Sequence, residues 1–571
     1  MPCDIVIQNG TVIDGSGNER IHANVSISNG RIVEVGDSCG RARQIIDAEG
    51  HIVAPGFVDG HTHMDAQVFW DDLGSCSCYH GVTSVVMGNC GFTLAPCKES
   101  EADHVFRNLE RAEDISRGAM LEGIDWNWES FPEYLNAVDS TPKGINYAGY
   151  LGHSALRTYV MGDRAFTDSP SEGELKRMGE LVQEAMTAGA IGFSTSRSRN
   201  HQTSDHKPVS SRIANWDEVK YLVGQMRATG AGIFEIAAED TGRDLDRLLD
   251  YQDRIKELAV DLKCPVTWGM FSSRHIPDRW RSFFNLLEEV EEAGGTMFAQ
   301  VHSRALNVIY SFEFNTPFDS WNVWRDIRQL PLEEQKARLR RADVRAKLVE
   351  SASSESERHK ERSVIVRPPN WHWVFVMDEP SGGTKRMDEL AAERGVSPVE
   401  LMIDMALESD FKCMFRQPIA NENEDDVIEM MKHPKSVVTF SDSGAHVSQI
   451  MDSSLQTHIF SHWVREREEL TIEQAVSMVT SETARRWGLR DRGMLKPGYA
   501  ADVVIFDPDT IGPDMPTVER DLPSGAKRLK QTAHGIKTTI VNGEVFLSSN
   551  EHTGSQSGRL LRGPLASRGS A

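Results

Sequence analysis

Strand-like and helical segments alternate through the centre of the chain, between about residues 55 and 485. Short apolar runs rich in β-branched residues, typical of buried strands, lie at residues 83–87, 145–150, 190–194, 232–236, 266–269, 296–300 and 436–440. Helical stretches occupy residues 173–188, 216–228, 243–258 and 280–293. A repeated order of strand and then helix predicts a parallel sheet, and the length of the region suits a (β/α)8 barrel. We therefore expect an α/β fold with a TIM barrel over residues 55–485.

The two ends of the chain share a different pattern. Residues 1–54 and 486–548 contain short β-rich runs separated by Asn-Gly turns, such as Asn9-Gly10 and Asn542-Gly543. Together they predict one small β-sandwich built from both termini. Residues 549–571 are rich in Ser, Gly and Arg and predict a disordered tail. A charge-dense helical insert near residues 315–365 interrupts the barrel pattern. A solvated connecting helix is favoured there over a lid or an oligomer contact.

The composition restricts the partners. The chain has 571 residues and a formal net charge of −23 at pH 7, which argues against nucleic acid as a partner. No apolar run approaches the roughly 18 residues needed to span a membrane, and no targeting segment is visible. The eight cysteines lack a disulfide-framework spacing and indicate free thiols in a reducing compartment. We expect a cytoplasmic protein that acts on a small molecule, with a homo-oligomer left open.

His61-Thr62-His63 follows an apolar run, residues 51–58, that we interpret as one buried strand. Two histidines two residues apart in an extended segment point to the same side, so both rings can bind one metal ion. Imidazole suits Zn, Cu, Fe and Ni better than Ca or Mg. The alternative is a chance pair in a chain with 19 histidines.

Two further residues stand at the ends of strand-like runs. Asp442 follows residues 436–440, where a carboxylate could face the histidines across a barrel mouth and accept a proton from an activated water. It could instead cap the next helix. Cys90 follows residues 83–87, where a thiolate would be a strong ligand for a zinc-like ion, although a free Cys is usually a small buried hydrophobe.

These motifs, taken in order, resemble the amidohydrolase superfamily, and within it the N-acyl-D-amino-acid deacylase (D-aminoacylase-like) group. The resemblance spans roughly residues 4–548, and its motifs lie at residues 12–17, 54–63, 88–96, 152–157, 192–196, 441–446 and 493–502. It implies a metal-dependent (β/α)8 barrel beside a small β-sandwich made of both termini.

The resemblance also implies roles for individual residues. His61 and His63 match the metal ligands of the first strand, and Cys90 matches the cysteine ligand. Asp442 matches the aspartate that binds metal and shuttles the proton.

The chain departs from the family pattern at two later strands, where histidine ligands are usual. The corresponding segments, residues 233–239 and 266–270, contain no histidine. Glu235 or Glu239 could supply an oxygen ligand, or His302 could reach in from the next strand. Otherwise His61, His63, Asp442 and Cys90 hold a single ion. We favour one divalent ion, expected to be zinc, over two.

Substrate-binding candidates lie at other strand ends. Arg197 and Arg199 follow residues 190–194 and could clamp a substrate carboxylate, or they could be ordinary surface arginines. His153 follows residues 145–150 and could polarise a carbonyl or serve the structure. His201, His206 and His446 lie in loops near the expected mouth and receive no role.

The expected activity is metal-dependent hydrolysis of a C–N amide bond. The substrate would be an N-acyl amino acid or a related N-acyl amine, with Asp442 as the proton shuttle. Two alternatives stay open. One is hydrolysis of a cyclic amide, carbamate or ester on the same scaffold. The other is a non-catalytic binding protein on a degenerate scaffold.

Overall fold

The computed structural model describes the chain except for residues 1, 38–40, 354–367, 381, 449–451 and 567–571. Its centre contains parallel strands in two sheets, a three-stranded sheet ordered β8–β9–β10 and a six-stranded sheet ordered β11–β12–β13–β14–β15–β19. Their bounds are β8 Phe57–Asp59, β9 Val82–Met87, β10 Asn146–Gly149, β11 Leu151–Gly152, β12 Gly192–Ser196, β13 Ile233–Ala237, β14 Val266–Met270, β15 Met297–Val301 and β19 Ser436–Val438. The predicted α/β fold with parallel strands is confirmed. Among the described residues the two sheets do not join into one continuous ladder, so closure of the barrel is not shown.

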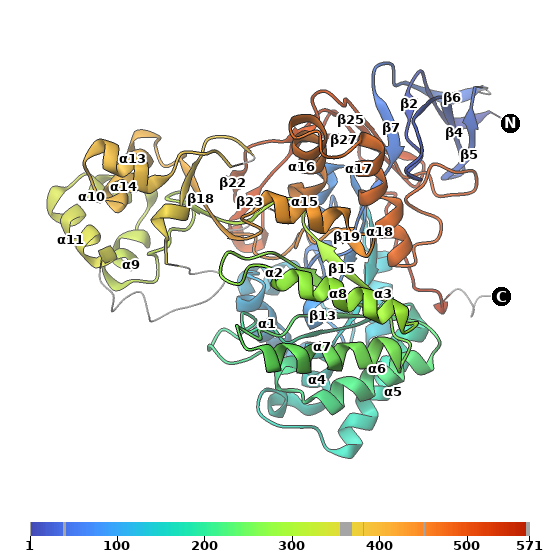
Figure 1. The fold of residues 1–571 in the computed structure, drawn as a ribbon, viewed down its shortest axis with the longest axis horizontal. Coiled ribbons are helices and arrows are strands. Elements are labelled where there is room, and N and C mark those ends of the chain that lie inside the picture. Colours follow the sequence, from blue (N-terminus) through green and yellow to red (C-terminus); the bar gives the residue numbers. More distant parts are fainter. Residues whose placement is uncertain (1, 38–40, 354–367, 381, 449–451, 567–571) are drawn as a thin grey trace.

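Helices connect these strands in the predicted order and cover the outside of the sheets (Figure 1). They are α1 Ala102–Ala112, α2 Arg117–Gly123, α3 Phe131–Ser140, α4 His153–Met161, α5 Glu172–Ala188, α6 Trp216–Ala228, α7 Leu245–Val260, α8 Arg279–Glu292, α15 Glu424–Lys432, α16 Leu455–His458, α17 Ile472–Val479 and α18 Ser481–Arg486. Local signals set their starts: the side chains of Ser171 and Asn215 accept hydrogen bonds from the first turns of α5 and α6. Within the described part of the chain, no helix is long and apolar enough to cross a membrane.

The apolar run before the histidine pair is two strands, so its interpretation as one strand was wrong. β7 (Ile52–Pro55) belongs to a seven-stranded sheet, and β8 (Phe57–Asp59) belongs to the parallel sheet. The chain passes from one sheet to the other at Gly56. The residues on both sides of Gly56 are equally apolar, so the sequence pattern does not show where β7 ends and β8 begins.

Strands from both ends of the chain form two further sheets. One sheet is ordered β5–β4–β1–β6, and the other β27–β26–β25–β20–β7–β2–β3. Antiparallel pairing of β20 with β7, with Val503 opposite Pro55, joins the C-terminal part to the N-terminal part. The strand bounds are β1 Cys3–Gln8, β2 Thr11–Val12, β3 Ile21–His22, β4 Asn24–Ser28, β5 Arg31–Gly36, β6 Ala42–Asp47, β20 Val503–Phe506, β25 Ile536–Val541, β26 Glu544–Ser548 and β27 Glu551–His552. One apolar cluster packs side chains from both sheets, including Ile27, Val53 and Val503. The domain limits at residues 54 and 485 stay predictions.

The insert is larger and more structured than the helix predicted near residues 315–365. An antiparallel sheet ordered β16–β18–β17 carries it, and Figure 1 shows it projecting from the rest of the molecule. Its elements are β16 Leu306–Ser311, α9 Asn322–Arg328, α10 Leu332–Leu339, α11 Ala342–Ser353, β17 Phe375–Met377, α13 Met387–Arg394, α14 Pro398–Glu408 and β18 Met414–Ala420. A separate apolar core, which includes Trp324, Leu348 and Phe415, explains why the insert is not a solvated connecting helix.

The C-terminal segment also differs from the prediction. Residues 549–566 are described and make regular backbone contacts, whereas a disordered tail was expected. Tyr147 N donates to Arg559 O at 2.9 Å and Leu561 N donates to Tyr147 O at 2.6 Å, so the segment pairs with the free edge of β10. A composition rich in Gly and Ser does not reveal these partners, because they lie on a distant strand.

Candidate metal centre

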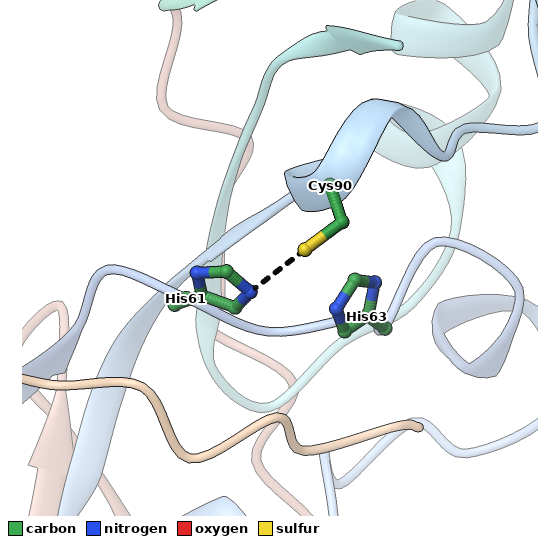
Figure 2. A group of neighbouring side chains, drawn as sticks. All are labelled: His61, His63 and Cys90. Carbon is green, nitrogen blue, oxygen red and sulfur yellow. Dashed lines mark hydrogen bonds between the residues drawn. The ribbon is translucent and has the colours of Figure 1, made fainter. Parts of the chain in front are cut away.

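The histidine pair lies directly after β8. Its backbone is held on the side of β19: Asp442 N donates to His61 O at 3.2 Å, and His63 N donates to Ser443 O at 2.8 Å. Both imidazoles are buried and converge with Cys90 (Figure 2), so that one ligand atom from each lies within 4.8 Å of the others. The structure brings these three predicted ligands together.

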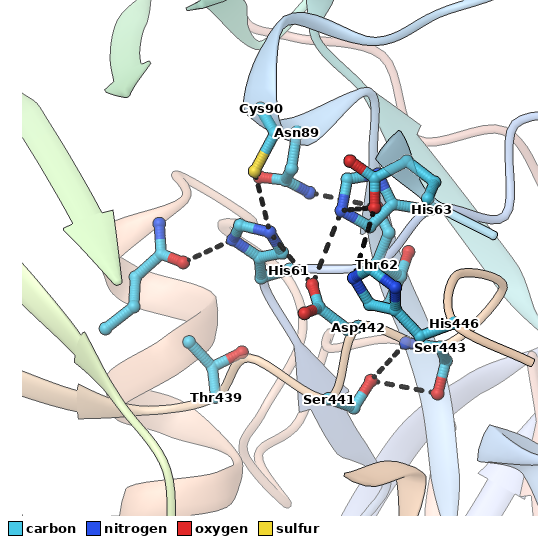
Figure 3. Close-up of polar contacts among 12 residues, drawn as sticks. His61, Thr62, His63, Asn89, Cys90, Thr439, Ser441, Asp442, Ser443 and His446 are labelled. Atoms are coloured by element: carbon cyan, nitrogen blue, oxygen red, sulfur yellow. Dashed lines mark hydrogen bonds and ion pairs between the residues drawn. The ribbon is translucent and has the colours of Figure 1, made fainter. Parts of the chain in front are cut away.

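Asp442 faces the pair from the loop after β19 (Figure 3). Its Oδ1 lies 3.3 Å from Nε2 of His61 and 3.3 Å from Nε2 of His63. Burial alone would raise the pKa of Asp442, but the hydrogen bonds and charge of the two histidines outweigh it and lower the pKa. The residue is therefore a carboxylate at neutral pH. Its φ of 51° is the left-handed region, which Asp adopts only at some expense in backbone energy.

Cys90 lies after β9, and its Sγ is 3.6 Å from Nε2 of His61. Its backbone also has a positive φ, 56°. Burial and the carboxylates of Glu235, Glu113 and Asp442 raise the pKa of the Cys90 thiol well above its usual range. A nearby cation is what would make it a thiolate. The seven cysteines that the structure describes are free thiols, as predicted for them.

The donor set fits a zinc-like ion. It offers two imidazole nitrogens, one sulfur and one carboxylate oxygen, which are the ligand types of tetrahedral zinc sites. Contacts of 3.3–3.6 Å between these donors match the edges of a tetrahedron with bonds of about 2.0–2.3 Å. Asp442 Oδ1 faces Nε2 of both histidines, so the three atoms point toward one position, as expected of ligands of a single cation.

Of the three substitute ligands considered, Glu239 is paired elsewhere, with Arg247 at 3.3 Å and Arg254 at 3.2 Å. Glu235 lies next to the cluster. It is buried on β13, and its Oε2 accepts a hydrogen bond of 2.7 Å from Cys90 N. Burial raises the pKa of Glu235 to about 7. His302 is buried after β15, and its Nδ1 accepts a hydrogen bond from Arg304 N at 3.2 Å. The alternative in which His302 reaches in as a ligand stays a prediction.

Sequence reasoning missed Gln300 on β15. Its Oε1 lies 2.6 Å from Nδ1 of His61. An acceptor there fixes the proton on Nδ1 and leaves Nε2 of His61 free to bind a metal. A lone Gln within an apolar strand carries no sequence signal for this role.

Glu113 was also missed, and His201 and His446 had received no role. The Glu113 carboxylate is 1% exposed and lies 3.6 Å from Nε2 of both His63 and His446 and 3.7 Å from Nε2 of His201. These residues come from the end of α1 and from two loops, so no strand pattern marks them.

A cavity of about 340 Å³ opens onto the cluster. Its wall includes the insert residues Leu306, Ile419 and Ala420, together with Phe271 and Phe440. The insert therefore contributes an apolar side to the site. Among the described residues, those that line the cavity include histidines and carboxylates but no Lys or Arg.

The predicted substrate residues lie outside this cavity. Arg197 donates to Ala214 O at 2.6 Å, and Arg199 is exposed near Asp240. Ser198 and Asn200, in the turn that follows β12, line the cavity instead. Both ring nitrogens of His153 are engaged, with Thr195 Oγ1 at 2.8 Å and Glu218 Oε1 at 3.0 Å. The structure supports neither the arginine clamp nor a substrate role for His153.

Fold and site together define a class: α/β proteins that carry a buried His, Cys and carboxylate cluster at the carboxyl ends of parallel strands. The Amidohydrolase family model matches residues 44–546, so the chain belongs to the amidohydrolase family, and the resemblance found in its motifs is confirmed.

Individual proteins that are similar to this chain bear the names of aminoacylases and deacylases. The D-aminoacylase of Alcaligenes xylosoxydans xylosoxydans is 28% identical over 565 residues, covering 98% of each chain. An N-acyl-D-glutamate deacylase from Bordetella bronchiseptica, solved with zinc and a phosphonate inhibitor, has a TM-score of 0.66 at 22% identity and covers 98% of this chain and 100% of that one. A D-aminoacylase structure concerned with a binuclear metal centre has a TM-score of 0.65 at 23% identity, with the same coverage. At these identities the structures establish the fold.

Proposed function

We propose that the chain is a metal-dependent amidohydrolase that removes the acyl group from an N-acyl amino acid or a related N-acyl amine. The observation that carries this proposal is the convergence of His61, His63, Cys90 and Asp442, of which the last three line the cavity. Relatives named as deacylases, which match 89–98% of this chain, support the reaction class. We further propose one resident divalent ion, zinc, in this cluster.

The ion, when bound, would polarise the amide carbonyl and acidify a water molecule. Asp442 is the base: its lowered pKa keeps it ionised to accept the proton of the water and pass it to the leaving nitrogen. Gln300 holds the His61 ring in orientation. The insert residues Leu306, Ile419 and Ala420 give the cavity an apolar wall that suits an apolar acyl group.

We also infer that the two parallel sheets are arcs of one (β/α)8 barrel. A parallel bridge between Thr62 and Ser443 and the donation from Gly60 N to Thr439 Oγ1, 2.6 Å, connect the segments after β8 and β19. β10 and β11 are separated by Tyr150 alone. This arrangement places every proposed ligand at the carboxyl ends of strands.

The Asp442→Asn variant tests the proposal. We expect a fall in kcat of about 10²–10⁴-fold, because the base is lost. We expect the metal content from elemental analysis to stay at the wild-type level, because three ligands remain. Asp240→Asn, which changes an exposed carboxylate outside the cavity, is the matched control and should keep wild-type turnover. Full activity of Asp442→Asn would refute the assignment.

The substrate class is tested with N-acyl-D- and N-acyl-L-amino acids, with and without a chelator. Turnover that disappears with the metal and returns on its addition supports the proposal. Turnover of a cyclic amide, carbamate or ester alone would instead establish the second reaction class. Absence of both turnover and bound metal would identify a binding protein on this scaffold.

A further inference from the structure

A second cavity, of about 140 Å³, lies where the projecting insert (Figure 1) meets the helices that follow it in sequence. Its wall combines insert residues with residues of α15 and of the π-helical segment Ile459–Glu466. Among the described residues, none lines both this cavity and the cavity of the metal centre. Its volume is below the roughly 300–1,000 Å³ of sites for drug-sized ligands, so a ligand here would be small.

Arg416, on β18, brings a positive charge into the second cavity. Within the described part of the chain, its guanidinium donates to Gly382 O at 2.6 Å, Gly383 O at 2.8 Å and Asn307 Oδ1 at 3.3 Å, and no carboxylate pairs with it. These bonds use three of its five N–H groups and leave one on each terminal nitrogen. Burial and the charge of Arg304 lower the pKa of Arg416 to about 10. An anion would offset this partly buried charge.

The two carboxylates in the wall of the second cavity are bound to other cations. Glu422 forms an ion pair with Arg274. Glu424 pairs with Arg467 and with Nε2 of His462, at 3.2 Å. Neither of them therefore takes the place of a ligand on the guanidinium.

The rest of the wall is largely apolar and aromatic. Trp373, Phe375, Val427 and Trp463 all line the second cavity. The guanidinium carbon of Arg416 lies 4.5 Å from the centroid of the Phe375 ring, so the cation and the aromatic surface adjoin. Trp463 comes from the π-helical segment, and this rare helix type occurs frequently at functional sites.

We propose that the second cavity binds a small organic carboxylate. The carboxylate would accept from the two remaining N–H groups of Arg416, because the guanidinium fork matches carboxylate geometry. The apolar body of the ligand would pack against Trp373 and Trp463. An inorganic anion would leave these aromatic side chains without a contact.

The strand that holds Arg416 also forms part of the wall of the cavity of the metal centre. β18 directs Arg416 into the second cavity and Ile419 into the other, because side chains of a strand point alternately to its two faces. Asn421, which lines the second cavity, exchanges hydrogen bonds of 2.9 and 2.8 Å with Ser272. Ser272 follows Phe271, a wall residue of the other cavity. A bound carboxylate would therefore contact the segments that shape the apolar side of the metal centre.

Calorimetric titration of the full-length protein with phenylacetate tests the proposal. Two further titrations use phenylacetamide, which is neutral and of similar shape, and inorganic phosphate. We expect one equivalent of phenylacetate to bind. Phenylacetamide should bind about tenfold more weakly or worse, because it lacks the charge that faces Arg416. Phosphate should bind more weakly than phenylacetate.

Variants place the bound molecule. Arg416→Gln should weaken phenylacetate binding about tenfold or more. Trp373→Ala, which removes part of the aromatic wall and leaves the guanidinium in place, should weaken it about 2–10-fold. Arg199→Gln is the matched control, because Arg199 is exposed and lines neither cavity, and it should bind as the wild type does. Circular dichroism checks that each variant is folded, and Trp373→Ala decides the matter if Arg416→Gln does not fold.

Four outcomes would overturn the inference. They are no binding of phenylacetate to the wild type, unchanged binding in the folded variants of Arg416 and Trp373, equal affinity for phenylacetamide, and tighter binding of phosphate. Unchanged binding in those variants would place phenylacetate elsewhere, for example at the metal centre. None of these outcomes bears on the proposed hydrolysis, because no substrate is turned over in the titration.

Discussion

Four residues of the site have a left-handed backbone conformation. Cys90, Phe440, Asp442 and His446 all have φ between 48° and 88°, although none is glycine. Each such residue costs roughly 1–3 kcal/mol and persists only where the surroundings enforce it. The Phe440 ring centroid lies 3.8 Å from that of His61, so one of these strained residues packs directly on a proposed ligand. The fold maintains this arrangement at the expense of stability, as expected where side chains are positioned for chemistry.

The ligands that the sequence predicted are those marked by a local pattern. His61, His63, Cys90 and Asp442 each follow a strand-like run, so strand periodicity and family motifs both indicate them. Glu113 has no comparable pattern, because it ends a surface helix whose inward face only the tertiary structure reveals. The arginine clamp stays without support, since the turn after β12 brings Ser198 and Asn200, and neither arginine, to the cavity wall.

The buried side chain of His80, which lies outside the proposed site, makes the stability of the protein depend on pH. Its Nδ1 lies 2.8 Å from Thr457 Oγ1, and burial lowers the pKa of His80 from 6.5 to about 3. Between these values the unfolded chain binds a proton that the folded chain does not. Stability is therefore complete above pH 6.5 and falls as the pH drops toward 3, by up to about 1.4 kcal/mol per pH unit.

We expect His80→Asn to reduce the slope of the free energy of unfolding against pH by up to about 1.4 kcal/mol per pH unit, which is the contribution of one proton. The measurement is the free energy of unfolding in urea at several values between pH 6.5 and 4. An unchanged slope would contradict the contribution of His80.

At the scale of elements, most boundaries of the central strands and helices were predictable. α6 spans Trp216–Ala228 as expected, because a polar cap and a regular apolar face define it. The insert was not predictable, since its strands pair with one another across many intervening residues: β16 and β18 hold Leu306 opposite Ala420. Local sequence around Leu332 shows a helix and gives no sign of the core against which it packs.

Alanine substitutions at two glycines in neighbouring elements are expected to change the free energy of unfolding in opposite directions. A Cβ on Gly192, in β12, would lie 1.9 Å from Ile233 O, whereas a Cβ on Gly173, in α5, meets nothing within 4 Å. We expect Gly192→Ala to lower the free energy of unfolding by about 1–3 kcal/mol or more through overpacking. Gly173→Ala, the control, should raise it by about 0.5–1 kcal/mol through helix propensity. Chemical denaturation measures both, and equal effects would contradict the close approach of β12 to β13.

At the scale of the whole molecule, the C-terminal segment links distant parts. Gly558 N donates to Lys143 O at 2.9 Å, and Gly563 N donates to Gly189 O at 2.8 Å, in addition to the pairing with β10. Composition alone predicted a disordered tail, because no local feature shows that β10 has a free edge on this side.

Deletion of residues 549–571 should therefore destabilise the protein. Each backbone hydrogen bond contributes about 0.5–1.5 kcal/mol net, so the four that hold the segment to the barrel region would amount to several kcal/mol. Thermal unfolding of the truncated and full chains measures the difference. Equal melting temperatures would show that the segment contributes nothing to stability.

The same pairing has a consequence for biosynthesis. Arg559 N also donates to Asn146 Oδ1, across 413 residues of chain. At about 5–20 residues per second, a ribosome needs roughly 20–80 s to add the segment after it has made β10. Throughout that interval the edge of β10 lacks the strand that will cover it, and an uncovered edge can pair with another chain. The nascent protein should therefore depend on chaperones most strongly late in translation, just before its last residues emerge.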